Sequence, residues 1–439
     1  MSYDAIVIGA GPAGEVCAGK LADEGMRVAV AERELVAGEC SYWACMPSKT
    51  LLRPGEAVAA ARHAPGAREA VTGEVDRAAA LAWRNAVVDD WDDSGQAEWL
   101  TDKGIDILRG DARLAGPGKV EVDGEAHEAK RIVIATGSAP AFPPVDGLEG
   151  LDGIWTNREV TGLKEVPETV LILGGGPVGA EMSQALTRLG ARVTVVEAAP
   201  RLLSREAEQV GDTLAEALRS DGVELRLDAK ASKAGHGGEG FALTVGDEEL
   251  SAERLVVATG RKPRLEGLGR ESVGIEPGAD GIEVDERLRA GDGVWAIGDV
   301  TGIMPFTHVG KYQARIAAED MLGRETKADY TAVPRVVFTD PQVAAVGESE
   351  GADTGTAKLS DLARTSTYAR NGEQRGFLTL VSDGERLTGA FAVGPEAGDW
   401  IQQATLAIRG RIPLDVLRDT IQPFPTFSEA YASALGDLG

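Results

Sequence analysis

Residues 5–14 read Ala5-Ile6-Val7-Ile8-Gly9-Ala10-Gly11-Pro12-Ala13-Gly14. The four apolar residues predict a strand, the glycines predict a tight turn, and the residues after them predict a helix to about Gly25. A second strand, Arg27 to Ala31, follows and leads to an acid. This order is the fingerprint of a dinucleotide site, where glycines let the backbone approach a pyrophosphate and the acid bonds a ribose hydroxyl. The cofactor-binding residues assigned to it are Gly9, Gly11, Gly14 and Glu32.

The same order of elements returns about 165 residues further along the chain. Val170 to Leu173 predict a strand, a glycine turn and a helix to about Leu189 follow, and Arg192 to Val196 predict the next strand. The acid after it accepts hydrogen bonds from a free 2′-hydroxyl and repels a 2′-phosphate, so we expect a preference for NADH over NADPH, which Arg201 nearby would weaken. Two fingerprints imply two dinucleotides, as for a flavin that receives hydride from a nicotinamide. The residues of the second site are Gly174, Gly176, Gly179 and Glu197.

Cys40 and Cys45 lie five residues apart, shortly after the first fingerprint. On a regular helix their Cα atoms would be roughly 8 to 9 Å apart, beyond the roughly 7 Å that a disulfide spans, so a bridge between them needs a distorted turn. A chain with three cysteines has no disulfide framework, which leaves redox or catalytic use for a close pair. The alternatives are two structural thiols or half of a metal site, although no second Cys or His cluster completes tetrahedral zinc ligation. We expect Cys17 to be a buried structural thiol.

The chain is strongly acidic, with a formal net charge of −25 from 45 basic and 70 acidic residues. This charge argues against a nucleic-acid partner. No apolar run approaches the length of a membrane span, and no charged segment followed by an apolar stretch marks the N-terminal residues. We therefore expect a cytoplasmic protein with neither a membrane nor a nucleic acid as partner.

With these features, the chain resembles the pyridine nucleotide-disulfide oxidoreductases, the family of dihydrolipoamide dehydrogenase, glutathione reductase and mercuric reductase. The resemblance runs through nearly the whole chain. Besides the fingerprints and the cysteine pair, it rests on a C-terminal segment, residues 331–439, and on three short stretches. These are Ala135-Thr136-Gly137, Ala258-Thr259-Gly260 and Val294-Trp295-Ala296-Ile297-Gly298-Asp299.

The resemblance implies roles for individual residues. The first fingerprint would bind FAD and the second the nicotinamide cofactor, with Asp299 on the ribityl chain of the flavin. Cys45 would touch the flavin and Cys40 would attack the substrate, so that hydride from NADH reaches FAD and an electron pair then reaches the disulfide. Lys49 and Glu181 would form a charged pair beside the flavin, where a cation stabilises the reduced ring. Further cofactor-binding residues implied in this way are Thr136, Gly137, Gly260 and Gly298.

The C-terminal segment departs from the family. The family has His-Pro-Thr followed shortly by Glu, donated across a dimer interface, whereas this chain has Phe424-Pro425-Thr426 and then Glu429. Phe cannot carry a proton, and loss of a positioned acid or base typically costs about 10² to 10⁴-fold in rate. The resemblance therefore implies a homodimer in which Phe424 and Glu429 reach the cysteine pair of the other subunit, with slowed exchange of ordinary disulfides.

We predict an α/β protein with two Rossmann-like dinucleotide-binding domains and a C-terminal α+β dimerisation domain. The resemblance divides the chain into an FAD domain, residues 1–148 and 269–330, a nicotinamide domain, residues 149–268, and an interface domain, residues 331–439. In the last, the sequence predicts strands at 335–338, 377–381 and 387–393 and a helix at about 399–409.

The predicted function is an FAD-dependent oxidoreductase that takes hydride from NADH, or NADPH, and passes electrons through Cys40 and Cys45 to a small molecule that the sequence does not identify. Three alternatives stay open. A flavin-only diaphorase or transhydrogenase would leave the cysteines idle. An enzyme resembling 2-ketopropyl coenzyme M oxidoreductase/carboxylase would use Phe424 to exclude protons. A catalytically quiet nucleotide-binding protein is the third.

Overall fold

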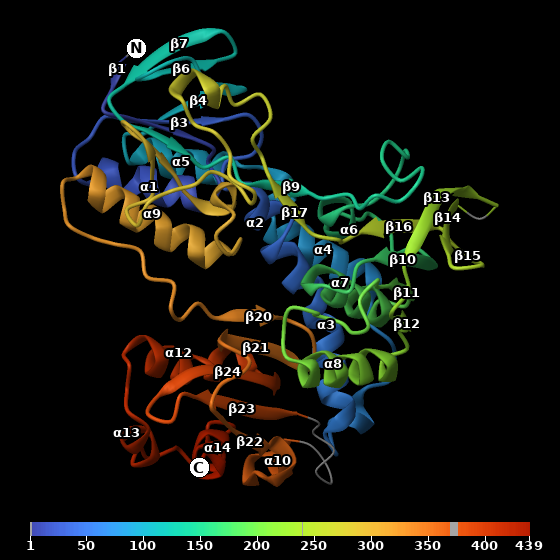
Figure 1. Ribbon diagram of the computed structural model, residues 1–439. Helices are drawn as coiled ribbons and strands as arrows, with labels where there is room; N and C mark the ends of the chain where they lie inside the picture. Colours follow the sequence, from blue (N-terminus) through green and yellow to red (C-terminus); the bar gives the residue numbers. More distant parts are fainter. Residues whose placement is uncertain (1, 239, 369–375) are drawn as a thin grey trace. The chain divides into compact units, whose positions relative to one another are not determined.

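The computed structural model describes residues 2–238, 240–368 and 376–439 (Figure 1). The chain forms two compact units, each assembled from three segments. The first unit comprises Met1–Pro47, Arg84–Ala141 and Gly260–Asp329, and the second comprises Ser48–Trp83, Phe142–Thr259 and Tyr330–Gly439. The divisions near residues 47 and 84 fall within helices α3 (Cys45–His63) and α4 (Arg77–Val87).

A six-stranded sheet forms the centre of the first unit. All neighbouring strands in it are parallel except β18 and β19. Every residue of β2 is buried, as expected of a parallel strand covered on both faces. In spatial order the strands are β18 (Arg289–Gly291), β19 (Val294–Ala296), β8 (Ile132–Ile134), β2 (Ala5–Ile8), β3 (Val28–Glu32) and β4 (Asp106–Arg109).

Smaller elements complete the first unit. A four-stranded sheet contains β1 (Ser2–Tyr3), β7 (Glu125–Ala129), β6 (Lys119–Val122) and β5 (Ala112–Leu114), in that order. A two-stranded ribbon pairs β9 (Ser138–Pro140) with β17 (Arg261–Pro263). The helices are α1 (Pro12–Asp23), α2 (Gly38–Tyr42), α5 (Ser94–Asp102) and α9 (Thr307–Met321).

Helices α1 and α9 lie side by side in this unit (Figure 1). Near the C-terminal end of α9, the Asp320 carboxylate accepts hydrogen bonds from Arg289 Nε at 2.7 Å and from Trp295 Nε1 at 2.9 Å. The Asp320 side chain is only 1% exposed. These bonds tie α9 to β18 and β19, and so fix the helix whose first residue is Thr307.

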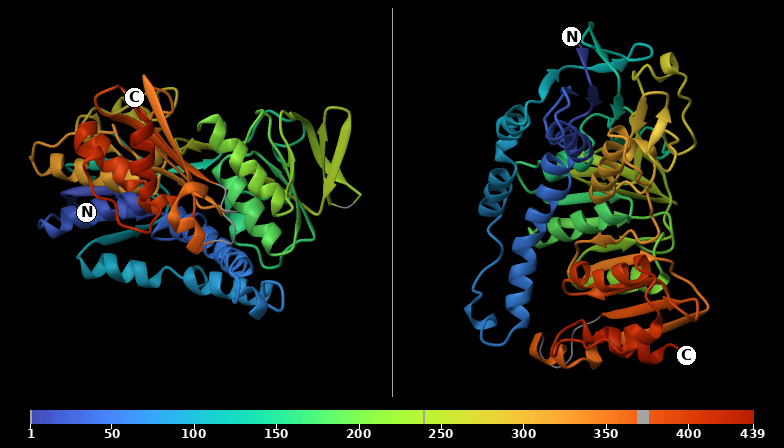
Figure 2. Two further views of the ribbon diagram at one scale, coloured as in Figure 1. Left: turned by 90° about the horizontal axis from the view of Figure 1, so that it is seen from below. Right: turned by 90° about the vertical axis from the view of Figure 1, so that its left-hand side faces the viewer.

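The second unit contains a four-stranded parallel sheet with the order β12-β11-β10-β16. Its strands are β12 (Glu224–Arg226), β11 (Arg192–Val196), β10 (Thr169–Leu173) and β16 (Arg254–Val257). Helices α7 (Pro177–Arg188) and α8 (Glu208–Ser220) pack beside this sheet, and α6 (Asn157–Thr161) contacts β16. An antiparallel sheet of β13 (Ala231–Gly237), β14 (Gly240–Val245) and β15 (Glu248–Ala252) adjoins it (Figure 2).

A five-stranded antiparallel sheet ends the second unit. Alternate residues of its strands point to opposite faces, and both faces are apolar. One face packs against α12, α13 and α14, and the other joins the core that contains α7 and α8. The strands are β20 (Arg335–Val337), β21 (Gln342–Gly347), β24 (Leu387–Gly394), β23 (Phe377–Ser382) and β22 (Asp353–Lys358). The helices are α10 (Ala363–Tyr368), α11 (Ala397–Trp400), α12 (Gln402–Arg409), α13 (Leu414–Arg418) and α14 (Glu429–Asp437).

Three residues on one face of α7 bond to the segment after β20. Glu181 Oε1 accepts from Phe338 N at 2.9 Å, Gln184 exchanges two hydrogen bonds with the backbone of Asp340 at 2.7 and 2.8 Å, and Arg188 pairs with the Asp340 carboxylate at 3.0 Å. Positions three and four apart lie along one helix face, which explains how a single helix reaches this segment three times.

The structure confirms the α/β fold and the strand–turn–helix–strand order of both fingerprints. The strands predicted at 335–338, 377–381 and 387–393 are β20, β23 and β24. The helix predicted at 399–409 begins earlier and is divided at Ile401 into α11 and α12. Among the helices of the described residues, none combines the length and hydropathy that crossing a bilayer requires.

We predict that Asp320→Asn lowers the free energy of unfolding by about 3 kcal/mol at neutral pH, because it removes the buried charge that Arg289 and Trp295 satisfy. Burial raises the pKa of Asp320, but the hydrogen bonds from Arg289 and Trp295 outweigh burial and leave this pKa lowered. A group with a lowered folded pKa stabilises the protein above its unfolded pKa and loses that effect as the pH falls through the folded pKa. The difference in the free energy of unfolding between the wild type and Asp320→Asn should therefore become smaller as the pH falls.

Urea denaturation of the wild type and of Asp320→Asn, from neutral pH into the acid range, measures the difference in the free energy of unfolding. Glu319→Gln, on the neighbouring position of α9, is the matched control because Glu319 pairs with Lys20 and Arg324 near the surface. If both variants lose the same free energy of unfolding, the prediction that the buried charge of Asp320 stabilises the fold is wrong.

Candidate active site

The two glycine turns have the same geometry. Gly9 and Gly174 have φ angles of +103° and +113°, in the region that favours glycine. A Cβ atom on Gly14 or Gly179 would lie 1.9 Å from the carbonyl oxygen of the first glycine of its own turn, so a side chain at either position is sterically excluded. These contacts let α1 and α7 begin directly after their strands.

Each turn leaves room for a phosphate group. No atom lies within 4 Å of a Cβ built on Gly11 or Gly176, and these glycines begin α1 and α7 with no side chain capping the helix. Uncapped backbone N–H groups and the helix dipole favour an anion at such a position. Within the described residues, both turns therefore fit the pyrophosphate of a dinucleotide.

The two acids also take equivalent positions. Glu32 accepts hydrogen bonds from the backbone N–H groups of Ala10 and Glu34, both at 2.8 Å. Glu197 accepts from Gly175 N at 2.5 Å and Ala199 N at 2.7 Å. Each carboxylate therefore braces its glycine turn, and its remaining lone pairs stay available to a ribose hydroxyl.

A polar network surrounds Asp299 in the first unit. Asp299 Oδ2 accepts from Ser138 Oγ at 2.6 Å, and Ser138 Oγ accepts from Arg261 Nε at 2.7 Å. Arg264 donates to the Ser138 carbonyl at 2.8 Å and to Glu39 at 3.0 Å. The network therefore connects Asp299 with the residue directly before Cys40.

The other predicted cofactor residues lie at the edges of this network. Thr136 Oγ1 donates to the carbonyl of Arg264 at 2.9 Å, and Gly298 N donates to Gln313 at 2.6 Å. The carbonyl of Gly260 accepts from Ala141 N at 2.9 Å. Gly137, Gly260 and Gly298 all have positive φ angles. The sequence had not singled out Ser138, Arg261, Arg264 or Glu39.

Cys40 and Cys45 lie on either side of a break in the helical backbone. Cys40 belongs to α2, which ends at Tyr42, and Cys45 is the first residue of α3. Trp43, with φ −138° and ψ 9°, leaves the helical conformation between them. This is the distorted turn that the spacing required, and it lets the two side chains contact each other. Both cysteines are thiols in this structure.

The neighbours of Cys40 shift the pKa of its thiol in opposite directions. A hydrogen bond to Cys45 and burial raise the pKa of Cys40, whereas a hydrogen bond from Thr307 lowers it. Thr307 Oγ1 donates to Cys40 Sγ at 3.1 Å and lies 3.7 Å from Cys45 Sγ. Thr307, another residue that the sequence had not singled out, therefore lies within hydrogen-bonding distance of both sulfurs. Cys17 is fully buried, as predicted, and desolvation raises its pKa to about 12.

In the second unit, Lys49 and Glu181 form the expected ion pair. Lys49 Nζ lies 2.8 Å from Glu181 Oε2, and the Glu181 side chain is only 7% exposed. Phe338 contacts both residues, because its ring lies 4.7 Å from Lys49 Nζ and its backbone N–H bonds to Glu181. Phe338, not predicted from the sequence, therefore orients both members of the pair.

The C-terminal segment presents Phe424 outward. This side chain is 74% exposed. Glu429 is the first residue of α14, and its carboxylate accepts from Thr426 N at 3.3 Å. Exposed apolar side chains are frequent in this part of the chain, namely Leu406, Val416, Ile421 and Phe424.

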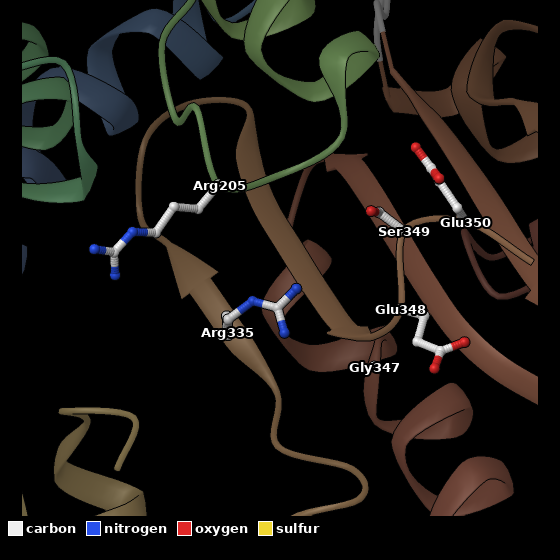
Figure 3. Close-up of a pocket in the computed structure, with 6 residues that line it drawn as sticks. All are labelled: Arg205, Arg335, Gly347, Glu348, Ser349 and Glu350. Atoms are coloured by element: carbon white, nitrogen blue, oxygen red, sulfur yellow. The ribbon is translucent and has the colours of Figure 1, made fainter. Parts of the chain in front are cut away.

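A separate cavity of about 380 Å³ in the second unit contains none of the predicted site residues (Figure 3). It is lined by Arg205, Arg335, Gly347, Glu348, Ser349 and Glu350. Arg335 is already paired with Glu206 through two contacts of 2.9 Å, so its charge is neutralised. In the described ranges, no cluster of three or more His, Cys, Asp or Glu side chains is arranged to hold a metal ion.

Comparison with known proteins agrees with this geometry. Residues 3–314 match the family described as pyridine nucleotide-disulphide oxidoreductase, and residues 333–435 match its dimerisation domain. Mercuric reductase of Acidithiobacillus ferrooxidans is 36% identical over 442 residues, which cover 96% of this chain and 80% of that protein. Dihydrolipoyl dehydrogenase of Thermus scotoductus is 34% identical over 452 residues, which cover 99% of this chain and 96% of that protein.

Solved structures show the same similarity over the full length. The HOCl-induced flavoprotein disulfide reductase RclA from Escherichia coli, in a Cu(II) complex, has a TM-score of 0.88 at 28% identity and 99% coverage of both chains. LpdA from Mycobacterium tuberculosis has a TM-score of 0.86 at 28% identity, covering 98% of this chain and 99% of that one. The chain therefore belongs to the pyridine nucleotide-disulphide oxidoreductase family and is an oxidoreductase.

Proposed function

We propose that this protein is an FAD-dependent oxidoreductase that takes hydride from NADH and passes an electron pair through Cys40 and Cys45 to a small electrophile or disulfide. The observation that carries the proposal is the contact of the two sulfurs across the break between α2 and α3. A bound FAD would accept the hydride and reduce the disulfide of this pair. The thiolate, once formed, is the nucleophile toward substrate.

The first glycine turn, Glu32 and Asp299 are the residues that we assign to FAD. The open space beside Gly11 and the uncapped start of α1 suit a pyrophosphate. Asp299 lies in the first unit with the thiol pair, and Ser138 and Arg264 link it to Glu39. We assign Lys49 to stabilising negative charge on the reduced ring, with Glu181 and Phe338 fixing its ammonium group.

We assign NADH to the second turn. Glu197 is held against the turn by Gly175 N and Ala199 N, so a negative charge lies where a 2′-phosphate would approach. Arg201, four residues after Glu197, carries the opposite charge. Its terminal nitrogen donates to the Ser204 carbonyl at 3.2 Å, while its buried Nε has no hydrogen-bond partner among the described residues.

We predict that kcat/KM for NADH exceeds that for NADPH by at least about tenfold, the effect of roughly 1.4 kcal/mol of repulsion. Glu197→Gln should reduce this ratio because it removes the repelling charge, while its amide oxygen keeps one of the two acceptors that Gly175 N and Ala199 N use. Arg201→Ala should raise the ratio. Steady-state kinetics with both nucleotides measure these values, and a wild-type preference for NADPH would refute the assignment.

We also propose that the protein works as a homodimer. Large apolar side chains of the dimerisation domain are exposed in the single chain, with Ile421 at 93% and Phe424 at 74%. A second copy would cover this surface. In that arrangement, Phe424 and Glu429 would reach the thiol pair of the other subunit, and Phe424 would supply an apolar wall where the family has a histidine base.

We predict that Phe424→His raises the rate of reduction of 5,5′-dithiobis(2-nitrobenzoate) by at least about tenfold, because a positioned acid or base contributes roughly 10² to 10⁴-fold. NADH-dependent release of the coloured thiolate measures this rate. Phe424→Leu is the control, since it changes the wall without adding a base. Light scattering should show the same dimer in all three proteins. An unchanged rate in Phe424→His would mean that absence of a base does not limit the reaction.

Anaerobic titration with NADH tests the central proposal. We predict that the first pair of electrons produces a long-wavelength absorption band between a Cys45 thiolate and the flavin. Cys45→Ser should abolish this band, whereas Cys40→Ser should retain it because Cys45 is then permanently unpaired. Plain bleaching of the wild-type flavin would favour the second candidate, a flavin-only diaphorase, which the exposed Phe424 in place of a base also suits. No reduction at all would indicate a quiet nucleotide-binding protein.

A further inference from the structure

The Thr307 hydroxyl is placed to act on both sulfurs of the thiol pair. Thr307 Oγ1 donates a hydrogen bond to Cys40 Sγ at 3.1 Å and lies 3.7 Å from Cys45 Sγ. We propose that Thr307 is a catalytic residue whose hydroxyl stabilises the Cys40 thiolate for attack on the substrate. This inference rests on the proposed function, in which Cys40 is the nucleophile.

Cys40 needs such a group because its surroundings disfavour the thiolate. Burial and the hydrogen bond to Cys45 both raise its pKa, and a negative charge on Cys45 raises it further. Two donors oppose these effects, the Thr307 hydroxyl and the backbone N–H of Cys45. Only the first is a side chain, so a substitution at position 307 can remove it. Hydrogen bonds to charged groups are the stronger ones, which makes a single donor significant.

A hydroxyl does not replace a base, because it does not take up a proton at neutral pH. It is, however, a donor and an acceptor at once. The same oxygen that donates to Cys40 can accept the S–H of Cys45, for which either atom is a possible donor. The single proton of the reduced pair can therefore pass from Cys40 to Cys45, which moves the negative charge from Cys45 to Cys40 without a histidine. Cys40 then forms a disulfide bond with one sulfur of a disulfide substrate, and the other substrate sulfur leaves as a thiolate. When Cys45 closes the Cys40–Cys45 disulfide, the remaining substrate sulfur leaves with the proton of Cys45.

The fold holds Thr307 in this place. Thr307 is the first residue of α9, a helix of 15 residues whose positive N-terminal end adds to the stabilisation of an anion. In the middle of α9, Gln313 bonds to Gly298 and Thr301. Near the C-terminal end of α9, Asp320 ties the helix to β18 and β19. The branched side chain of Thr also restricts its own rotation.

The titratable residues that neighbour the three contacting residues along the chain are already paired or stacked. Lys49, four residues after Cys45 on α3, pairs with Glu181 at 2.8 Å. Glu39 precedes Cys40, and its charge is compensated by Arg261 and Arg264 at 3.6 and 3.0 Å. His308 follows Thr307, and its ring stacks on Phe306 with centroids 5.2 Å apart. Cys45 is the titratable group whose charge raises the pKa of Cys40, and Thr307 contributes a hydrogen bond that lowers it.

Thiol alkylation in the holoenzyme tests the proposal without NADH. The protein is reduced with a phosphine, exposed anaerobically to iodoacetamide between about pH 6 and 10, and each cysteine is followed by mass spectrometry. Thr307→Val removes the hydroxyl and keeps the branched shape, so we expect Cys40 alkylation near neutral pH to slow about tenfold and its midpoint to shift upward by about one pH unit. Thr307→Ser keeps the hydroxyl and should stay within about twofold of the wild type.

Cys17 reports on folding in the same experiment, because it is fully buried and should react only if the chain opens. If Cys17 becomes alkylated in Thr307→Val, that variant is replaced by Thr307→Ala, provided that Cys17 stays unreactive there. An unchanged pH profile in a folded variant without the hydroxyl would overturn the proposal, as would an equal loss in Thr307→Ser. Failure of the NADH titration would leave this result unaffected, so the two proposals fail separately.

Discussion

At its two glycine turns the backbone of this protein comes too close to itself for a side chain to fit, and the starts of α1 and α7 depend on this contact. In each turn, the Cα of the last glycine lies so near the carbonyl of the first that no side chain fits. The helix can then start at the end of its strand and aim its first N–H groups into open space. Because Gly14 and Gly179 meet the same constraint, the chain carries two turns of equal design, which are the two nucleotide sites that we propose.

The extent to which sequence predicts this structure follows from the range of each interaction. The fingerprints are local, so their glycines and acids are readable from spacing alone, and the broken turn between Cys40 and Cys45 follows from helix geometry. Thr307 lies 267 positions from Cys40, and Phe338 lies 289 positions from Lys49. Nothing in the sequence near the cysteine pair or the lysine indicates either contact, since tertiary folding creates both.

Other differences have equally specific causes. The helix expected at 399–409 divides at Ile401, where no glycine or proline gives a signal. Strands β21 and β22 were not predicted, because small residues such as Ala344, Ala345 and Gly355 weaken the pattern of a strand. Their identity comes instead from pairing with β24 and β23. The substitution at Phe424 was evident only against the family pattern, since an isolated aromatic residue before a proline carries no signal.

Helix α7 is joined by several bonds to the segment that follows β20. Three residues of this helix bond to the segment, namely Glu181, Gln184 and Arg188. Phe338, at the start of the segment, also contacts Lys49. Helix α7 begins at the second glycine turn and ends among these bonds. One helix therefore connects the second glycine turn directly with the segment that joins β20 to β21 of the five-stranded sheet.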